Sequence, residues 1–278
     1  GGEKAAFIAR ALPKIVSRAP LTRGKSIAYL DDGYMYVDDS GTLKRWSPGQ
    51  SAFIPSVVGT MSTATEWVRL AAGHDGTVIT GLNGTSYAYI TNSGTITNKS
   101  IVGESFVAAV YHRGWYLYAS ITGKLWWSDV SDDVDGLNFA SADSSRDRII
   151  ELIDVGPAVA VFGERSIEFW ASTGSADAVF SPIQEATQKI GVGNANQVKQ
   201  LGGATYFWGF PEGGTPGLYA LEGMKPTRIS SEDFERDLGL GIAADWFDAQ
   251  VDGFSMRGHT FIHCSHRQTG KAAMLDVS

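Results

Sequence analysis

Apolar and polar residues alternate along many short stretches of the chain, and this alternation indicates β-strands. In WYLYAS, residues 115–120, the odd positions fall on one face of a strand and the even positions on the other. Six segments share one template, in which an apolar strand, a glycine turn, an aromatic-rich strand, a second turn and a third strand follow one another. These repeats span residues 26–46, 68–90, 106–128, 149–171, 195–221 and 248–277.

The repeats begin 38 to 53 residues apart, and their short loops are of the Asp-Gly, Arg-Gly, Gly-Gly or Gly-Lys type. Meandering sheets with this period are typical of propeller blades. One meander cannot bury both of its faces, whereas radial stacking covers each sheet with its neighbours. We therefore predict an all-β protein, a β-propeller of about six blades of antiparallel meanders with little helix, over residues 26–278.

The stretch VAVFGERSIEFWASTG, residues 159–174, contains a charged pair between two apolar strands. One interpretation of Glu164 and Arg165 is a catalytic carboxylate beside an anion-binding guanidinium. The other is a hairpin tip, with Gly163-Glu164-Arg165 in the same position as the Arg-Gly turns at 113–114 and 257–258. An exposed ion pair at a turn is the ordinary outcome, so we predict the hairpin tip.

Helical patterns are few. Residues 4–19 have helical spacing, but Pro13 interrupts them. Residues 231–239 predict one or two helical turns with Ser231 as the N-cap. The segment from Ser47 to Glu66 is a long connection in which we expect contacts with other molecules.

Charge is distributed unevenly along the 278 residues, whose net charge is −7. Residues 1–25 contain six basic residues and one acidic residue, so this segment carries +5 and the remainder −12. This balance argues against a broad DNA-coating surface. It indicates a basic N-terminal arm that docks to an acidic neighbour or contacts phosphates, and a solvated terminal extension is the open alternative.

Cysteine and hydropathy exclude several classes of protein. Cys264 is the single cysteine, so no intramolecular disulfide and no cysteine-rich zinc site is possible. We expect this thiol to be a small buried hydrophobe. No apolar run reaches 18 residues, so we predict no membrane span, and we also expect no signal peptide.

Metal and phosphate motifs are incomplete. The acidic stretch of residues 128–139 fits part of a calcium loop, but Ala142 stands where a bidentate glutamate is needed. His259 and His263 lie four apart on a predicted strand, roughly 13 Å along it, which is too far for one zinc ion. Residues 191–197, GVGNANQ, lack the Gly-Lys-Ser/Thr end of a phosphate loop. We therefore predict no metal and no cofactor.

Catalytic motifs are also missing. The Gly-x-Ser-x-Gly elbow does not occur, and His266 adds no ligand pair to His263. Arg165, Arg228 and Arg257 form a candidate guanidinium cluster for an acidic sugar, although nothing in the sequence makes them converge. We predict no catalytic residue and no enzyme.

Four blocks of the chain, in order, resemble the packaged-DNA stabilisation proteins of short-tailed bacteriophages, also called tail hub or head-completion proteins. Residues 125–149 resemble that family's Trp-Ser-Asp, Leu-Asn-Phe-Ala-Ser-Ala and Asp-Arg-Ile pattern, and residues 161–174 resemble its Phe-Gly-Glu, Ile-Glu-aromatic-Trp and Thr-Gly block. Residues 204–230 resemble its Phe-Trp strand, glycine-rich turn and Arg-Ile-Ser end, and residues 248–265 resemble its Gly-His strand. The family continues beyond Val277 toward a tryptophan-containing strand, so we expect the propeller to be cut short at its C-terminus.

The resemblance implies a structural protein of the virion. It implies a self-associated ring, expected to be a hexamer, at the tail or neck of the portal vertex, made in the bacterial cytoplasm. The implied partners are the portal and head-to-tail adaptor proteins, tail fibres or tailspikes, a needle-like protein and packaged DNA near the channel. The implied mechanism is mechanical, because a preassembled surface docks onto a ring and closes the DNA exit channel.

Two alternatives remain open. A glycan-binding or glycan-cleaving propeller of the sialidase type predicts a cleft with paired carboxylates and measurable activity. A scaffold propeller of the WD or kelch type predicts Trp-Asp or double-glycine motifs at fixed positions, and these do not recur here.

Overall fold

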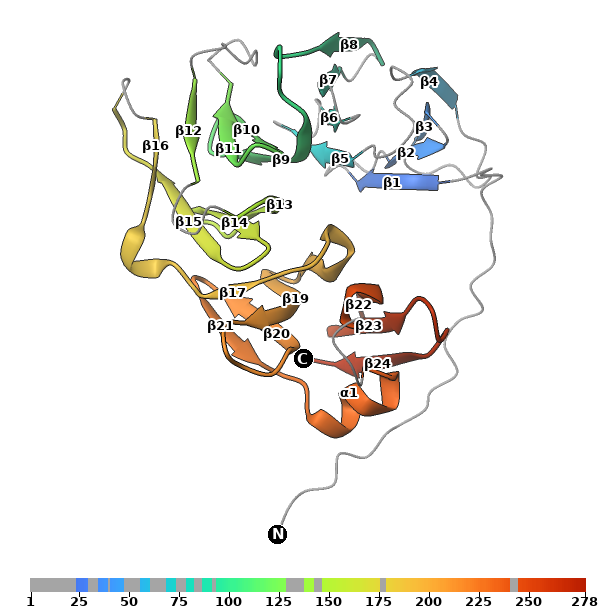
Figure 1. The fold of residues 1–278 in the computed structure, drawn as a ribbon. Coiled ribbons are helices and arrows are strands. Elements are labelled where there is room, and N and C mark those ends of the chain that lie inside the picture. Colours follow the sequence, from blue (N-terminus) through green and yellow to red (C-terminus); the bar gives the residue numbers. More distant parts are fainter. Residues whose placement is uncertain are drawn as a thin grey trace.

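The computed structural model describes residues 24–29, 35–39, 41–47, 56–60, 69–73, 79–82, 87–91, 94–128, 138–142, 147–175, 179–240 and 245–278. Within them the chain forms six antiparallel sheets that follow one another around a common centre (Figure 1). The predicted all-β propeller of six blades is confirmed.

The first three blades have four strands each, in chain order across the sheet. Blade one contains β1 (Gly24–Tyr29), β2 (Met35–Asp39), β3 (Thr42–Trp46) and β4 (Ser56–Thr60). Blade two contains β5 (Arg69–Ala72), β6 (Ile79–Leu82), β7 (Tyr87–Ile90) and β8 (Ile96–Lys99). Blade three contains β9 (Phe106–His112), β10 (Trp115–Ser120), β11 (Lys124–Trp127) and β12 (Phe139–Ser141).

In the described residues, blades four, five and six have four, five and three strands. Blade four contains β13 (Ile149–Asp154), β14 (Val159–Gly163), β15 (Ile167–Ser172) and β16 (Phe180–Pro182). Blade five contains β17 (Ile190–Gly191), β18 (Val198–Leu201), β19 (Ala204–Pro211), β20 (Gly217–Glu222) and β21 (Lys225–Arg228). Blade six contains, among the described residues, β22 (Ala249–Met256), β23 (His259–His266) and β24 (Ala272–Asp276).

Each predicted repeat corresponds to the three inner strands of one blade. The repeat of residues 106–128, for example, matches β9 to β11, in which Tyr118 pairs with Ala109 and Trp126. The fourth strand of blades one to five comes from the segment between two repeats. β1 begins at Gly24, so the last two residues assigned to the basic arm lie in the first strand. Residues 1–23 lie outside the described part of the chain.

Among the described residues the core consists of five apolar clusters, which join blade one to two, two to three, three to four, four to five and five to six. Between blades four and five, Phe162 and Phe207 meet at 5.2 Å between ring centroids. On the other face of blade four, Trp170 packs in the cluster shared with blade three. Both faces of the inner strands of blade four are therefore buried, as radial stacking requires.

The predicted tip at 163–165 is a hairpin turn, between β14 and β15, but its assumed equivalence to the Arg-Gly turns is wrong. Those turns join β9 to β10 and β22 to β23, the first and second strands of their blades, whereas the Glu164 turn joins the second and third. Successive hairpins reverse the chain, so the two kinds of turn lie at opposite ends of the propeller. Arg113 and Arg257 adopt φ values of 48° and 52° before a glycine, which is the backbone of a tight hairpin.

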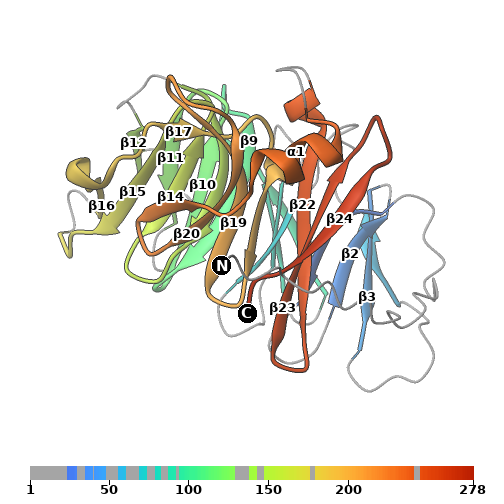
Figure 2. The ribbon, with the colours of Figure 1, turned by 90° about the horizontal axis from the view of Figure 1, so that it is seen from below.

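Helices occupy one end of the propeller. The α-helix α1 (Glu232–Leu238) begins at the predicted N-cap, because the Ser231 hydroxyl accepts from the Phe234 N–H, and ends at Gly239 with φ 88°. Three 3₁₀ helices accompany it, namely η2 (Gln184–Ala186), η3 (Ala195–Gln197) and η4 (Asp245–Asp248). Figure 2 shows α1 at one end and the C-terminus at the other. No helix in the described residues is long and apolar enough to cross a membrane.

Candidate functional site

The carboxylate of Asp147 holds the charged tip at Glu164 and Arg165 in place. Asp147 Oδ2 accepts hydrogen bonds from the Arg165 N–H at 2.6 Å and from the Ser166 N–H at 3.0 Å. The Glu164 N–H donates to the Arg148 carbonyl at 3.2 Å. These bonds satisfy the turn's backbone donors, so Asp147 serves as a structural cap.

Two glycines let the surrounding chain approach this tip. A Cβ on Gly163 would lie 2.5 Å from Asp147 Oδ1, and a Cβ on Gly191 would lie 2.2 Å from the Glu164 carbonyl. The Val192 N–H also donates to the Gly163 carbonyl at 2.9 Å, which ties blade five to the tip. The turn is therefore held between two blades.

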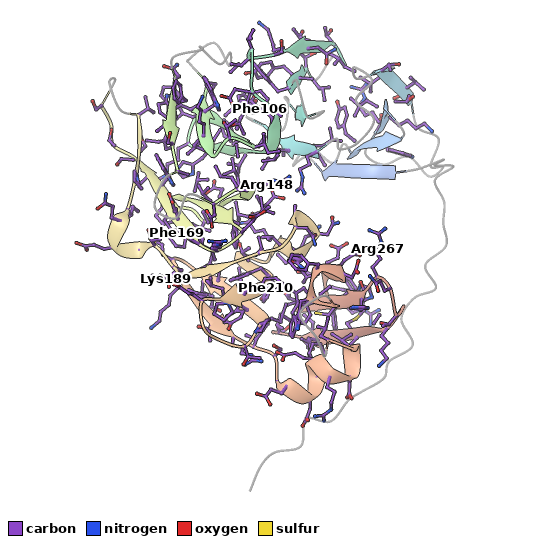
Figure 3. All side chains as sticks on the ribbon, in the orientation of Figure 1. Phe106, Arg148, Phe169, Lys189, Phe210 and Arg267 are labelled. Carbon is purple, nitrogen blue, oxygen red and sulfur yellow. The ribbon has the colours of Figure 1, made fainter. Side chains whose placement is uncertain are left out.

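A hollow of about 470 Å³ opens beside the tip, between blades three and four. Its lining comprises Ile121, Thr122, Gly123, Ala142, Asp147, Arg148, Glu164 and Arg165. The side chains of Arg148, Glu164 and Arg165 are exposed, and Figure 3 shows Arg148 beside blade four. A glycosidase needs two carboxylates free to act on one sugar bond, and here Asp147 is engaged by the turn. The hollow therefore lacks the chemistry that the glycan-cleaving alternative requires.

A second polar clamp holds α1 to the outer strand of blade five. Arg228 Nη2 donates to both oxygens of Glu235 at 2.8 Å, and the Ser230 hydroxyl donates to Glu235 at 2.5 Å. The Leu218 N–H donates in turn to the Ser230 hydroxyl at 2.8 Å. Glu235 is 3% exposed, and its bond to Arg228 raises the pKa of that guanidinium. The candidate sugar-binding arginine is therefore a structural ion-pair partner.

The predicted guanidinium cluster does not form. Arg165 lies at the β14–β15 turn, Arg228 on β21 and Arg257 at the β22–β23 turn, so three different blades carry them. Arg228 is engaged by Glu235, and the tips of Arg165 and Arg257 lie at opposite ends of the propeller.

Ion pairs line the centre of the ring. Arg69 of blade two pairs with Glu151 of blade four, and Lys199 Nζ of blade five lies 3.0 Å from Asp252 Oδ1 of blade six. A cavity of about 430 Å³ lies beside both pairs, with His263 in its wall. Burial raises the pKa of the Glu151 carboxyl, and the Arg69 guanidinium opposes that rise. In the sequence, the feature that could have indicated this ion pair is a glutamate inside the apolar run IIELI.

Three histidines lie on β23, and each has different surroundings. His259 Nδ1 lies 2.9 Å from Asp276 Oδ2, His263 faces the central cavity, and His266 Nδ1 accepts from the Thr269 N–H at 3.1 Å. In the described residues no group of three His, Cys, Asp or Glu side chains is arranged for a metal ion.

Cys264 is fully buried, as predicted, and burial raises the pKa of its thiol to about 12. A thiol with that pKa is a packing group rather than a nucleophile. Of the acidic stretch at 128–139, residues 129–137 lie outside the described part, and Ala142 is buried. GVGNANQ runs from the last residue of β17 to the end of η3, where Asn194 and Gln197 make a capping box.

Comparisons with known proteins identify the family. The family model described as bacteriophage P22 Gp10, beta-propeller, of the phage stabilisation family, matches residues 44–267. No curated protein sequence gives a significant match.

Solved structures support the fold. A chain of the mitotic checkpoint complex aligns with a TM-score of 0.62 at 12% identity, covering 100% of this chain and 85% of that one. Virginiamycin B lyase from Staphylococcus aureus, with quinupristin, aligns with a TM-score of 0.59 at 11% identity, covering 92% and 80%. The Cps50 (Swd1) propeller domain of Myceliophteria thermophila aligns with a TM-score of 0.59 at 11% identity, covering 92% and 84%. At these identities the likeness concerns the fold alone. The family match covers most of the chain, so this protein belongs to the phage stabilisation family of bacteriophage P22 Gp10 and is a β-propeller structural protein of the virion that holds packaged DNA.

Proposed function

We propose that the protein is a tail hub of a short-tailed phage. It docks below the portal and adaptor ring, closes the DNA exit channel and carries tail fibres or tailspikes and a needle-like protein. The observation that carries this proposal is the family match over residues 44–267. It acts mechanically and without turnover.

The stiffness of the described blades supports a docking role. Five apolar clusters join consecutive blades, and the turn at Glu164 and the helix α1 are each fixed by a carboxylate clamp. A surface that is already ordered loses little conformational entropy when it binds, so more of the contact energy holds the assembly. That energy opposes the pressure of packaged DNA.

The negative charge of the propeller favours a protein that closes the channel over one that coats the DNA. The chain outside residues 1–25 carries −12, and a phosphate backbone is repelled by such a surface. We propose that several copies form a ring, a hexamer in our working model, and that the basic arm of residues 1–25 contacts the adaptor or a neighbouring copy.

Electron microscopy of virions that carry a label on this protein tests the proposal. We expect label only at the vertex where the tail joins the capsid. Label on the capsid faces would refute the tail hub. A second assay mixes the purified protein with isolated portal and adaptor rings, where we expect binding by the full chain and weaker binding after deletion of residues 1–25.

A further inference from the structure

Phe247 is a large apolar side chain left in solvent at the end of the propeller that carries α1. It belongs to η4, between blades five and six, and is 59% exposed. Its ring stacks on Phe210 of β19, with 5.7 Å between centroids and 23° between planes. Figure 3 labels Phe210 on blade five. Exposed aromatic rings that stand on an ordered surface are the typical anchors of protein interfaces.

The backbone below this ring is clamped by two amide side chains. Asn194 Nδ2 donates to the Phe247 carbonyl at 2.8 Å, and Gln197 Nε2 donates to the Trp246 carbonyl at 2.5 Å. A Cβ on Gly193 would lie 2.7 Å from the Phe247 ring, so only glycine lets the ring settle there. We call Gly193, Phe210, Trp246 and Phe247 the Phe247 platform. Its order in the free protein lowers the entropy cost of binding.

Carboxylates stand on the helix that leads to the platform. Glu232, Asp233 and Asp237 of α1 are exposed, and the guanidinium of Arg236 is engaged by Asp233. The apolar side of α1 packs, through Leu238, in the cluster that also holds Trp246. The β23–β24 turn carries the basic residues Arg267 and Lys271. A partner segment that combines apolar and basic residues fits this pairing of an aromatic ring with carboxylates.

We propose that the Phe247 platform binds the N-terminal segment, residues 1–23, of a second copy of this chain. That segment carries five basic residues and one acidic residue, and its sequence KAAFIARALPKIV supplies Phe7, Ile8 and Leu12 for the aromatic platform. This inference rests on the proposed ring, in which each copy gives a segment to one neighbour and receives one from the other. Such head-to-tail contacts close into rings.

Light scattering after size-exclusion chromatography measures the mass of the purified chain and tests the exchange. We expect oligomers for the full chain and monomers for two variants, one lacking residues 1–23 and one carrying Phe247→Ser. The self-association constant of the Phe247→Ser variant is expected to fall at least tenfold. The deletion variant keeps the Phe247 platform, and Phe247→Ser keeps the N-terminal segment. A mixture of the two is therefore expected to give a one-to-one dimer that does not assemble further.

Matched controls separate binding from folding. Phe254→Ser removes another exposed aromatic ring, 38% exposed on blade six, and is expected to leave the mass unchanged. Glu232→Lys with Asp237→Lys changes only exposed side chains of α1, so the fold is expected to persist while association weakens. Thermal melting of each variant verifies the fold.

Three outcomes would overturn the inference. They are a monomeric full chain, an unchanged mass for Phe247→Ser, or no dimer in the mixture. If Phe247→Ser loses binding to portal and adaptor rings but keeps its own mass, another protein occupies the platform. In that case the tail hub stands and only the exchange fails, whereas label away from the tail vertex would remove the tail hub itself.

Discussion

Replacement of Glu235 by alanine is the sharpest test of the clamp that holds α1. The substitution removes both oxygens that accept from Arg228 and the partner of the Ser230 hydroxyl. Loss of one member of a buried ion pair costs about 3–5 kcal/mol. Because the Arg228 side chain is 31% exposed, water relieves part of that cost. We therefore expect the free energy of unfolding to fall by about 2–3 kcal/mol.

The consequence reaches beyond the ion pair. Leu238 of α1 packs in the cluster between blades five and six, so a loosened helix also exposes apolar surface there. Urea unfolding followed by tryptophan fluorescence reports on the region directly, since Trp208 and Trp246 are buried in that cluster. Melting of the same variant is expected about 5–10 °C below the wild type.

Asp233→Ala is the matched control. Asp233 lies on the same helix and also pairs with an arginine, but its side chain is 80% exposed, so its loss is expected to change stability by less than about 0.5 kcal/mol. The double variant Arg228→Met with Glu235→Leu removes both charges and is expected to be more stable than Glu235→Ala. Equal stabilities for Glu235→Ala and Asp233→Ala would refute the clamp.

Two further predictions concern the tip of blade four and the base of blade three. Gly191→Ala places a Cβ against the Glu164 carbonyl and is expected to cost about 2–3 kcal/mol in urea unfolding, more than Gly156→Ala, which has free space but a φ of 90°. For Glu104, burial raises the pKa, but hydrogen bonds from Lys124 and neighbouring hydroxyls outweigh it and hold the pKa below its ordinary value. Its stabilisation is therefore complete above the unfolded pKa of about 4.3 and lost as pH falls through the lower folded pKa. Below pH 5, the free energy of unfolding in urea is expected to fall faster with decreasing pH for the wild type than for Glu104→Gln. Parallel plots of unfolding free energy against pH for the two proteins would contradict this.

The inner strands of the blades were predictable from sequence because they carry most of the apolar side chains of the core. Alternating apolar residues and glycine turns mark them in all six repeats, and Ser231 and Cys264 behave as their residue types predict. The outer strands carry a weaker signal. β12 and β16 have three residues each, and β8, ITNK, has four residues of which one is apolar, so their apolar pattern is too short to recognise.

Contacts that span blades were beyond the sequence. Arg69 and Glu151 are 82 positions apart, and only the arrangement of the blades around a common centre brings them together. The misplaced equivalence of the Glu164 turn has a related cause. Turns at both ends of the propeller use glycine and charged residues, so composition does not tell which end a turn occupies.

The residues within the family-like blocks explain what those blocks do. Asp147 caps a turn, Arg228 and Ser230 hold a helix, and Glu168 accepts from the Trp170 indole N–H at 3.0 Å inside blade four. An enzyme family's shared residues meet at one point, where substrate reacts. Here they are spread over blades and ends, where Asp147 holds a turn, Arg228 and Ser230 hold a helix, and Glu168 bonds within a strand. A structural protein that holds packaged DNA needs resistance of this distributed kind, so the pattern itself favours a scaffold.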